Sequence, residues 1–301
     1  MKRFLRWLGI GASVVIVIAA IAAAGLWWYV GRIGVERVTE RLYMLTGLGG
    51  NVAVLVTDDG AVVVDSMTMV RQGSAILSRI ADLTDKPVVT MINTHYHLDH
   101  THGNPAFAPR TRMIATERTL EHLKTRDAEY WAEPPASQLL PNETFTVARE
   151  YGFGSHQVRM IHPGCGHTDG DLVVLFVGEK VLHTGDLFFH GHYPNIDLEA
   201  GGTVRGWIDT LDRVKELQFD RIIPGHGLLT DRAGLERFQD FLRALWTKTS
   251  DVVAAGGSLA DAKKDVDLSS FGLAPIWFAP YLNHDFVVGR AYEEAAKSGD
   301  R

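Results

Sequence analysis

The chain has 301 residues, and its 30 lysines and arginines against 36 aspartates and glutamates give a formal net charge of −6. A single cysteine excludes an internal disulfide bond, a four-cysteine zinc site and a CxxC redox pair. The acidic balance, with no cluster of basic residues in the body of the chain, argues against nucleic acid as a partner, and a hydrophobic content of 46% predicts a globular fold.

An apolar segment follows three basic residues at the N-terminus and runs without a charged side chain from Trp7 to Val30. At 1.5 Å per residue it would extend about 36 Å, enough to cross a hydrocarbon core of ~30 Å. We therefore expect residues 1–32 to form an uncleaved, single-pass anchor in the inner (cytoplasmic) membrane, with residues 33–301 as a periplasmic catalytic domain. The alternative is a signal peptide cleaved near Ala22–Ala24, which would release the domain into the periplasm.

In chain order, hydrophobic patterns and turn residues predict the elements of this domain. Strands are expected at Val35–Leu45, Asn51–Thr57 and Ala61–Asp65, a helix at Met69–Leu83, a strand at Pro87–Asn93 and a helix at Glu117–Tyr130. Further strands follow at Thr144–Ala148, Gln157–His162, Leu172–Val177 and Lys180–His183, then a helix at Val204–Leu217, a strand at Phe219–Ile223 and helices at Asp231–Ala255 and Val287–Lys297. Because each group of strands is followed by helices, we predict one α+β domain of two packed sheets with helices on their outer faces.

Four side chains that commonly bind metals stand within six residues, directly after the predicted strand Pro87–Asn93. Side chains two apart in an extended segment point to the same side, so His95, His97 and Asp99 share one direction. His100 breaks this alternation, but its side chain reaches a position next to the other three if the chain turns after it. Burying four such side chains without a metal or other partners would be costly, so the pattern predicts a metal site.

Three later residues are candidates for distant ligands of the same site. His167 lies in a loop between two predicted strands, Asp186 ends a strand, and His226 follows another strand. Each stands beside a glycine, where the backbone can turn a side chain toward the edge of a sheet. With the first cluster they make five histidines and two aspartates, nearly enough for two four-coordinate ions when waters complete the shells.

The motifs HxHxDH, a GHxxxD-like sequence, GD and PGHG occur in this order, and the chain from about Val35 onward thereby resembles the metallo-beta-lactamase fold superfamily. The resemblance implies an αββα sandwich with a two-metal site at one edge. It also implies the ligands of each zinc ion, namely His95, His97 and His167 for the first, Asp99, His100 and His226 for the second, and Asp186 between both, as in the glyoxalase-II-like and lactonase branches. Asp65 matches a family aspartate that supports the metal-binding loop.

The implied cofactors are two zinc ions per chain, with iron or manganese as alternatives. Two such ions lower the pKa of a shared water to about 7, and Asp99 is expected to orient the resulting hydroxide and relay its proton. We expect hydrolysis of an ester, thioester, lactone or amide bond in a small molecule, with a β-lactam among the candidates. Cys165 is expected to be a small packed residue rather than a nucleophile.

Two other functions stay open. A mononuclear iron oxygenase of the persulfide-dioxygenase type shares the fold and uses two histidines and one carboxylate, although His100 at hand for a second metal favours the binuclear hydrolase. The other alternative is a catalytically dead binding protein, against which every ligand position holds a competent residue. The sequence indicates neither the natural substrate nor the oligomeric state.

Overall fold

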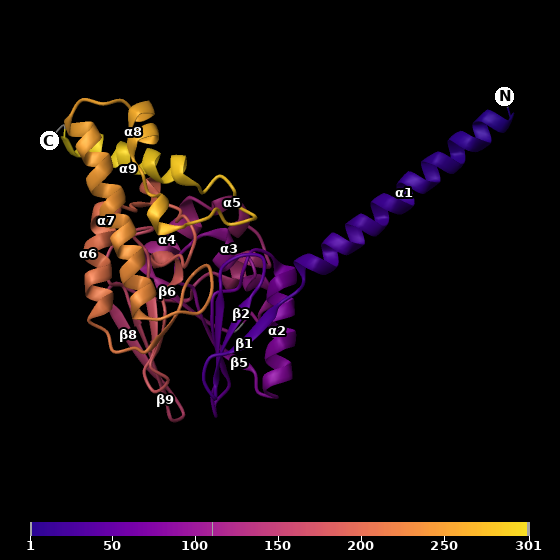
Figure 1. Cartoon of the computed structure of the whole chain (residues 1–301). Coiled ribbons are helices and arrows are strands. Elements are labelled where there is room, and N and C mark those ends of the chain that lie inside the picture. Colours follow the sequence, from indigo (N-terminus) through magenta and orange to yellow (C-terminus); the bar gives the residue numbers. More distant parts are fainter. Residues whose placement is uncertain (1, 110, 300–301) are drawn as a thin grey trace.

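The computed structural model describes residues 2–109 and 111–299. In this part of the chain two β-sheets pack face to face, α2 covers the outer side of the first sheet, and α6, α7 and α9 cover the outer side of the second (Figure 1). The predicted sandwich of two sheets between helices is therefore confirmed.

The first sheet, within the described residues, has seven strands in the order β1-β2-β3-β4-β5-β6-β7. Strands β1 to β4 pair antiparallel, and β4 to β7 pair in parallel. Their bounds are Gly34–Arg37, Leu42–Thr46, Val52–Val56, Ala61–Val64, Val88–Ile92, Arg112–Thr116 and Glu143–Phe145. Because β4 and β5 are parallel, the residues that follow them emerge at the same edge of the sheet.

The second sheet has five strands over the same described range, in the order β12-β11-β10-β9-β8. Strands β11 and β12 are parallel, and the other pairs are antiparallel. The bounds of β8 to β12 are Ala148–Phe153, His156–Ile161, Val173–Phe176, Val181–His183 and Arg221–Ile223. The segments after β11 and β12 therefore also start side by side at one edge.

Alternate side chains of the central strands face two different cores. In β3, Ala53 and Leu55 belong to the apolar cluster between the sheets, whereas Val52 and Val54 belong to the cluster beneath α2. Strand β10 divides its side chains in the same way between the central cluster and the cluster beneath the helices of the second sheet. Burial on both faces explains why these strands are apolar at every position.

The helices that follow the N-terminal one have these bounds: α2 Val70–Leu83, α3 Leu98–Thr101, α4 Glu117–Thr125, α5 Ala128–Trp131, α6 Val204–Lys215, α7 Arg232–Ala254, α8 Leu259–Asp265 and α9 His284–Gly299. Helix α7 begins as predicted, because the carboxylate of Asp231 accepts a hydrogen bond from the backbone N–H of Gly234 and so caps the first turn. Its apolar side chains pack on the second sheet, with Leu235 and Leu242 fully buried.

Two predicted elements are divided in the structure. The expected strand Val35–Leu45 is a hairpin of β1 and β2, because the hydroxyl of Thr39 accepts a hydrogen bond from the N–H of Leu42 (3.1 Å) and closes a turn. The expected helix Glu117–Tyr130 is interrupted at Asp127, whose backbone is not helical. The carboxylate of Asp127 contacts Nε2 of His102 and accepts a hydrogen bond from the indole N–H of Trp131. Strand β6 and helix α8 were not predicted, and the predicted strand Thr144–Ala148 joins the end of β7 to the start of β8.

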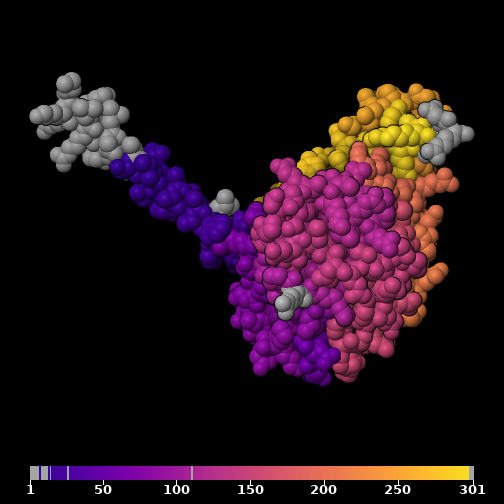
Figure 2. Space-filling model, turned by 180° about the vertical axis from the view of Figure 1, so that it is seen from behind, coloured from indigo at the N-terminus to yellow at the C-terminus, as the bar shows by residue number. Residues whose placement is uncertain are grey.

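Helix α1, Lys2–Val30, extends away from the body of the protein (Figures 1 and 2). Its last turn contacts the body through aromatic side chains. The guanidinium of Arg71 lies 4.1 Å from the centre of the Trp27 ring, and the rings of Tyr29 and Trp277 meet edge to face at 5.9 Å.

The prediction of a membrane anchor in residues 1–32 is wrong. Among the residues that the structure describes, none of the helices combines the length and the hydropathy that crossing a bilayer requires. The predicted single-pass placement in the inner membrane, with its periplasmic catalytic domain, is therefore not supported.

Candidate metal centre

The HxHxDH segment leaves the carboxyl end of β5 and enters the short helix α3. His97 is still extended (φ −62°, ψ 146°), and the helix begins at the next residue, Leu98. The chain therefore turns earlier than the sequence analysis expected, which was after His100. As a consequence, Asp99 does not continue the direction of the two preceding histidines but turns together with His100.

Asp65 fixes this segment from the end of the parallel neighbour β4. Its carboxylate accepts hydrogen bonds from the backbone N–H of Thr94 (2.8 Å) and from the hydroxyl of the same residue (2.7 Å). The carboxylate oxygen that accepts from the hydroxyl, Oδ2, also lies 2.7 Å from Nδ1 of His100. Because Asp65 engages Nδ1, Nε2 of His100 faces the centre, which is the supporting role expected for this aspartate.

A first group of four side chains brings its donor atoms together at the sheet edge: His95, His97, His167 and Asp186 have one donor atom each within 4.8 Å of one another. Nδ1 of His97 lies 2.7 Å from Nε2 of His167. Oδ2 of Asp186 lies 3.8 Å from Nε2 of His95 and 3.6 Å from Nε2 of His167. This set of three imidazoles and a carboxylate fits a four-coordinate zinc ion.

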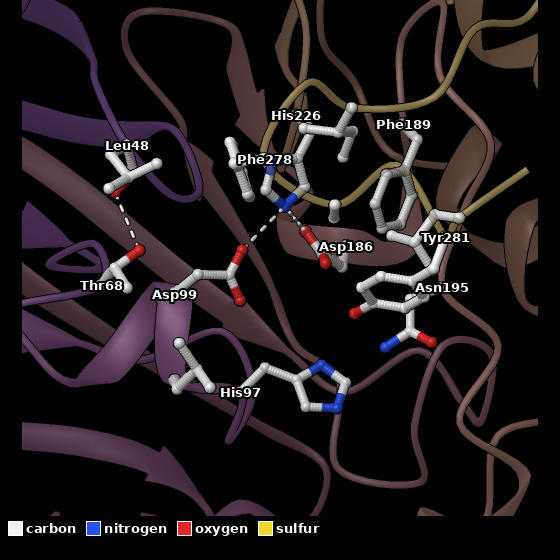
Figure 3. Close-up of a pocket in the computed structure, with 14 residues that line it drawn as sticks. Leu48, Thr68, His97, Asp99, Asp186, Phe189, Asn195, His226, Phe278 and Tyr281 are labelled. Atoms are coloured by element: carbon white, nitrogen blue, oxygen red, sulfur yellow. Dashed lines mark hydrogen bonds and ion pairs between the residues drawn. The ribbon is translucent and has the colours of Figure 1, made fainter.

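A second group lies directly beside the first and contains Asp99, His100 and His226. Nε2 of His226 is 3.2 Å from Oδ2 of Asp99. The other oxygen of Asp186, Oδ1, lies 3.1 Å from Nε2 of His100 and 3.4 Å from Nε2 of His226. One carboxylate thus faces both groups, with a different oxygen toward each; Figure 3 shows it next to His226.

Two glycines allow the backbone to approach the centre this closely. A Cβ atom at Gly225 would lie 2.1 Å from Oδ1 of Asp186, and one at Gly50 would lie 2.1 Å from Cε1 of His100. Any side chain at either position would displace the group that it meets, so these glycines are part of the site's construction.

The carboxylates and imidazoles perturb one another's pKa values. Burial alone would raise the pKa of Asp186, but His226 and His100 outweigh it and hold that pKa well below its usual range. Burial likewise opposes ionisation of Asp99, and the same two histidines bring its pKa to about 2. For His167, burial outweighs the neighbouring carboxylates and lowers the pKa of the imidazole to about 4. At neutral pH both carboxylates are therefore charged, and the imidazole of His167 is neutral.

Three atoms of the site are buried and make no aligned hydrogen bond among the described residues: Nε2 of His95, Nε2 of His100 and Oδ1 of Asp186, although the last two lie 3.1 Å apart. Unpaired buried polar atoms are rare and costly. All three are donor atoms that a divalent cation accepts. The residues present therefore fit a pair of metal ions of the zinc type.

Asp197 was not predicted to belong to the site. Its Oδ2 accepts a hydrogen bond from the hydroxyl of Tyr96 (2.5 Å) and lies 2.9 Å from Nε2 of His97. A carboxylate on the outer ring nitrogen is the usual way to orient a histidine whose other nitrogen faces a metal. A second orienting contact joins Nδ1 of His167 to the backbone carbonyl of Asn195 (2.8 Å). Asp197 stands thirty residues after His167, and no local motif marks it.

Four other histidines in this region contact backbone carbonyls or Asp127 instead of the two groups. His183 contacts the carbonyl of Asn51, His190 that of Leu228, and His192 that of Ala274. His102 pairs with Asp127 and stacks on Tyr130 at 3.5 Å. Cys165 lies outside both groups of metal-type side chains, and burial raises the pKa of its thiol.

A cavity of about 400 Å³ opens onto the two groups (Figure 3). Besides four of the candidate ligands it is lined mainly by apolar side chains, from five segments of the chain: Leu48, Thr68, Leu98, Phe189, Asn195, Ile276, Phe278, Ala279, Tyr281 and Leu282. The sequence analysis did not identify these residues, because apolar side chains of loops carry no spacing pattern. The cavity makes the metal centre accessible to a small molecule.

Comparisons with known proteins agree with this construction. The family profile described as Metallo-beta-lactamase superfamily matches residues 45–226. The chain is 30% identical over 240 residues to the 2,4-dinitroanisole O-demethylase subunit alpha of Nocardioides sp. (strain JS1661), covering 76% of this chain and 69% of that protein. It is 26% identical over 224 residues to the metallo-beta-lactamase type 2 of Bacillus sp. (strain 170), covering 71% and 83%. Among solved structures, a metallo-beta-lactamase from Pontibacter korlensis shares the fold with a TM-score of 0.62 at 21% identity, over 70% of this chain and 99% of that one.

Proposed function

The chain belongs to the metallo-beta-lactamase superfamily and is a metal-dependent hydrolase, and from this premise we propose that it uses two zinc ions to cleave an ester, thioester, lactone or amide bond. A β-lactam is one such amide. The proposed ligands are the seven residues of the two groups: His95, His97 and His167 in the first, Asp99, His100 and His226 in the second, and Asp186 between them.

One observation carries the proposal for two ions rather than one. Asp186 directs Oδ2 toward His95 and His167 and Oδ1 toward His100 and His226. A single ion in the first group would leave Oδ1 of Asp186 and Nε2 of His100 buried, 3.1 Å apart and without an aligned hydrogen bond. Two ions would satisfy the donor atoms on both sides of the carboxylate.

Zinc ions bound in this way polarise the carbonyl group of a substrate and make water acidic enough to act as a nucleophile near neutral pH. The chain's own contribution to proton transfer falls to Asp99. It lines the cavity, its side chain is 20% exposed, and its low pKa keeps it ionised at neutral pH. We propose that Asp99 orients the attacking water and takes its proton.

The reaction balances without a further reagent. The acyl carbon gains the hydroxyl of water, and its bond to the leaving oxygen, sulfur or nitrogen breaks. The proton held by Asp99 passes to the leaving group, so the carboxylate is regenerated for the next cycle.

The test is a metal analysis of the purified full-length chain together with a substrate panel. We expect two equivalents of zinc per chain and turnover of at least one ester, thioester, lactone or β-lactam. One equivalent of iron, with oxygen consumption on a persulfide, would instead indicate the oxygenase of the persulfide-dioxygenase type. Full zinc loading without hydrolysis of any member of the panel would favour the binding protein.

A further inference from the structure

One wall of the cavity is not accounted for by metal binding. It consists of residues 276–282, here called the C-terminal wall, between the 3-10 helix η5 (Ser269–Phe271) and helix α9. Ile276, Ala279 and Leu282 are buried, whereas Tyr281 at the entrance is 61% exposed. A buried apolar floor with an exposed aromatic ring at its entrance is the arrangement by which small-molecule sites hold an apolar group.

This wall is held in place from several sides. The Phe278 ring packs against the ring of His226 with centroids 6.0 Å apart, and Trp277 meets Phe278 edge to face at 5.5 Å. The backbone N–H of Tyr193 donates to the carbonyl of Ala274 (3.2 Å), just before the wall. The wall is therefore a fixed surface next to a candidate metal ligand.

Apolar side chains also face the cavity from the other segments. Phe189 is buried beside His226, Leu98 is 50% exposed, and Leu48 contributes from the loop before β3. Figure 3 shows Phe189 and Tyr281 across the cavity from Asp99. Asp99 thus lies on one side of the cavity and the aromatic rings of Phe189 and Tyr281 on the other, while Leu48 lies on the side of Asp99.

Away from the candidate metal ligands, the described lining of the cavity offers no cationic side chain to an acidic substrate. Among the described residues no lysine or arginine lines it, and its polar groups outside the candidate ligands are neutral: the side chains of Thr68 and Asn195 and the hydroxyl of Tyr281. Arg71 and Arg32 do not line the cavity, and their guanidinium groups lie over the rings of Trp27 and Trp28 in α1. A carboxylate on the part of a substrate that meets the C-terminal wall would lose its hydration without gaining an ion pair.

We infer that the enzyme selects uncharged small molecules whose alkyl chain or aromatic ring packs on the C-terminal wall, and that it discriminates against the same molecules carrying a carboxylate on that group. The inference rests on the proposed hydrolytic function of the neighbouring site. The wall lies outside residues 45–226, which match the family profile.

The kinetic test compares two esters that differ in one group, 4-nitrophenyl hexanoate and mono-4-nitrophenyl adipate, on the zinc-loaded full-length chain. We expect kcat/KM for the hexanoate to exceed that for the adipate by about 30-fold or more. The Tyr281→Arg variant, which places a cation at the entrance, should reduce this ratio about tenfold. Val147→Arg is the matched control, because Val147 is 70% exposed and does not line the cavity.

A binding test separates the wall from catalysis. Hexanophenone and 6-oxo-6-phenylhexanoate are ketones that cannot be hydrolysed and differ in the same carboxylate. Their affinities are measured by tryptophan fluorescence with and without zinc. We expect the neutral ketone to bind about tenfold tighter or more in both states. If the preference exists only without zinc, repulsion by Asp99 and Asp186 causes it, and the inference is overturned.

The outcomes distinguish this inference from the proposed function. Preferential binding of hexanophenone, reduced by Tyr281→Arg, without hydrolysis of any ester would contradict the function and keep the inference. Hydrolysis of both esters at similar rates, with equal affinity for both ketones, would overturn the inference and keep the function. A preference that Tyr281→Arg leaves unchanged would also overturn it, because the wall would then not be its source.

Discussion

The two sides of the cavity are built by different means. The metal-binding side comes from segments that leave the ends of neighbouring strands, and its buried polar atoms are oriented by carboxylates such as Asp65 and Asp197. The C-terminal wall comes from a loop of apolar residues next to α9 and is held by ring contacts. Changes on the first side should therefore affect metal binding and the rate of the chemical step, whereas changes on the second should affect the choice of substrate.

The largest effect is expected from His97→Ala. The variant removes a donor atom that lies 2.7 Å from Nε2 of His167, and the first group then keeps two imidazoles and the shared carboxylate. We expect zinc content to fall and kcat/KM to decrease on the order of 10³-fold or more. The side chain of His97 is 17% exposed, so the loss of stability should be about 1 kcal/mol.

Its control is His156→Ala, which removes an imidazole that pairs with Glu179 at the start of β9. Zinc analysis, kinetics and thermal unfolding are measured for both variants. Full activity and zinc content in His97→Ala would contradict the ligand assignment.

A smaller loss is expected from Asp197→Asn. In the native chain, Oδ1 of Asp197 accepts a hydrogen bond from the backbone N–H of Ala200 (3.0 Å). The side-chain oxygen of asparagine can still accept this hydrogen bond. Its amide nitrogen cannot accept hydrogen bonds from His97 and Tyr96. We expect a 10- to 100-fold loss of zinc affinity, measured by competition with a chelator, and recovery of activity at high zinc concentration.

The matched control for this variant is Glu199→Gln on the same 3-10 turn, since Glu199 pairs with Arg290 rather than with a candidate ligand. If Asp197→Asn and Glu199→Gln change zinc affinity equally, Asp197 does not orient His97. If Asp197→Asn lowers the unfolding temperature but not zinc affinity, its role is structural.

The sandwich could be predicted because its strands and long helices have strong local patterns. Strand β3 is apolar throughout, and α7 combines an N-terminal cap at Asp231 with an apolar face. The hairpin at Thr39 and the break at Asp127 could not be predicted, because hydrogen bonds of individual side chains decide them. The apolar N-terminal segment was interpreted as a membrane span on hydropathy, which the described helices do not support.

The candidate ligands could be grouped from sequence because each follows a strand and, apart from the first cluster, stands beside a glycine. Parallel pairing of β4 with β5 and of β11 with β12 then brings the strand ends to one edge. Asp197 and the C-terminal wall escape such reasoning. Their roles depend on tertiary contacts with His97 and His226, and their residue types occur in any loop or core.

A modest effect on the apolar side of the cavity is expected from Tyr29→Ala. Tyr29 is the residue of α1 whose ring meets Trp277 in the C-terminal wall. Since an aromatic pair contributes about 0.5–1.5 kcal/mol, we expect KM for 4-nitrophenyl hexanoate to rise about two- to fivefold with kcat unchanged. The control is Trp28→Ala, which removes a ring that contacts Arg32 and not the wall. Equal effects of both variants would mean that Tyr29 does not support the wall.

The smallest effect is expected from Cys165→Ser, on the metal-binding side. Cys165 stands two residues before His167, and its thiol would be the strongest nucleophile near the site if it were ionised. Burial raises the pKa of this thiol, so little thiolate is present at neutral pH, and the sulfur belongs to neither group of candidate ligands. The variant should keep kcat/KM and zinc content within about twofold of the unmodified chain. A decrease of tenfold or more in kcat/KM with zinc retained would make Cys165 a nucleophile, and the same decrease with zinc lost would make it a ligand.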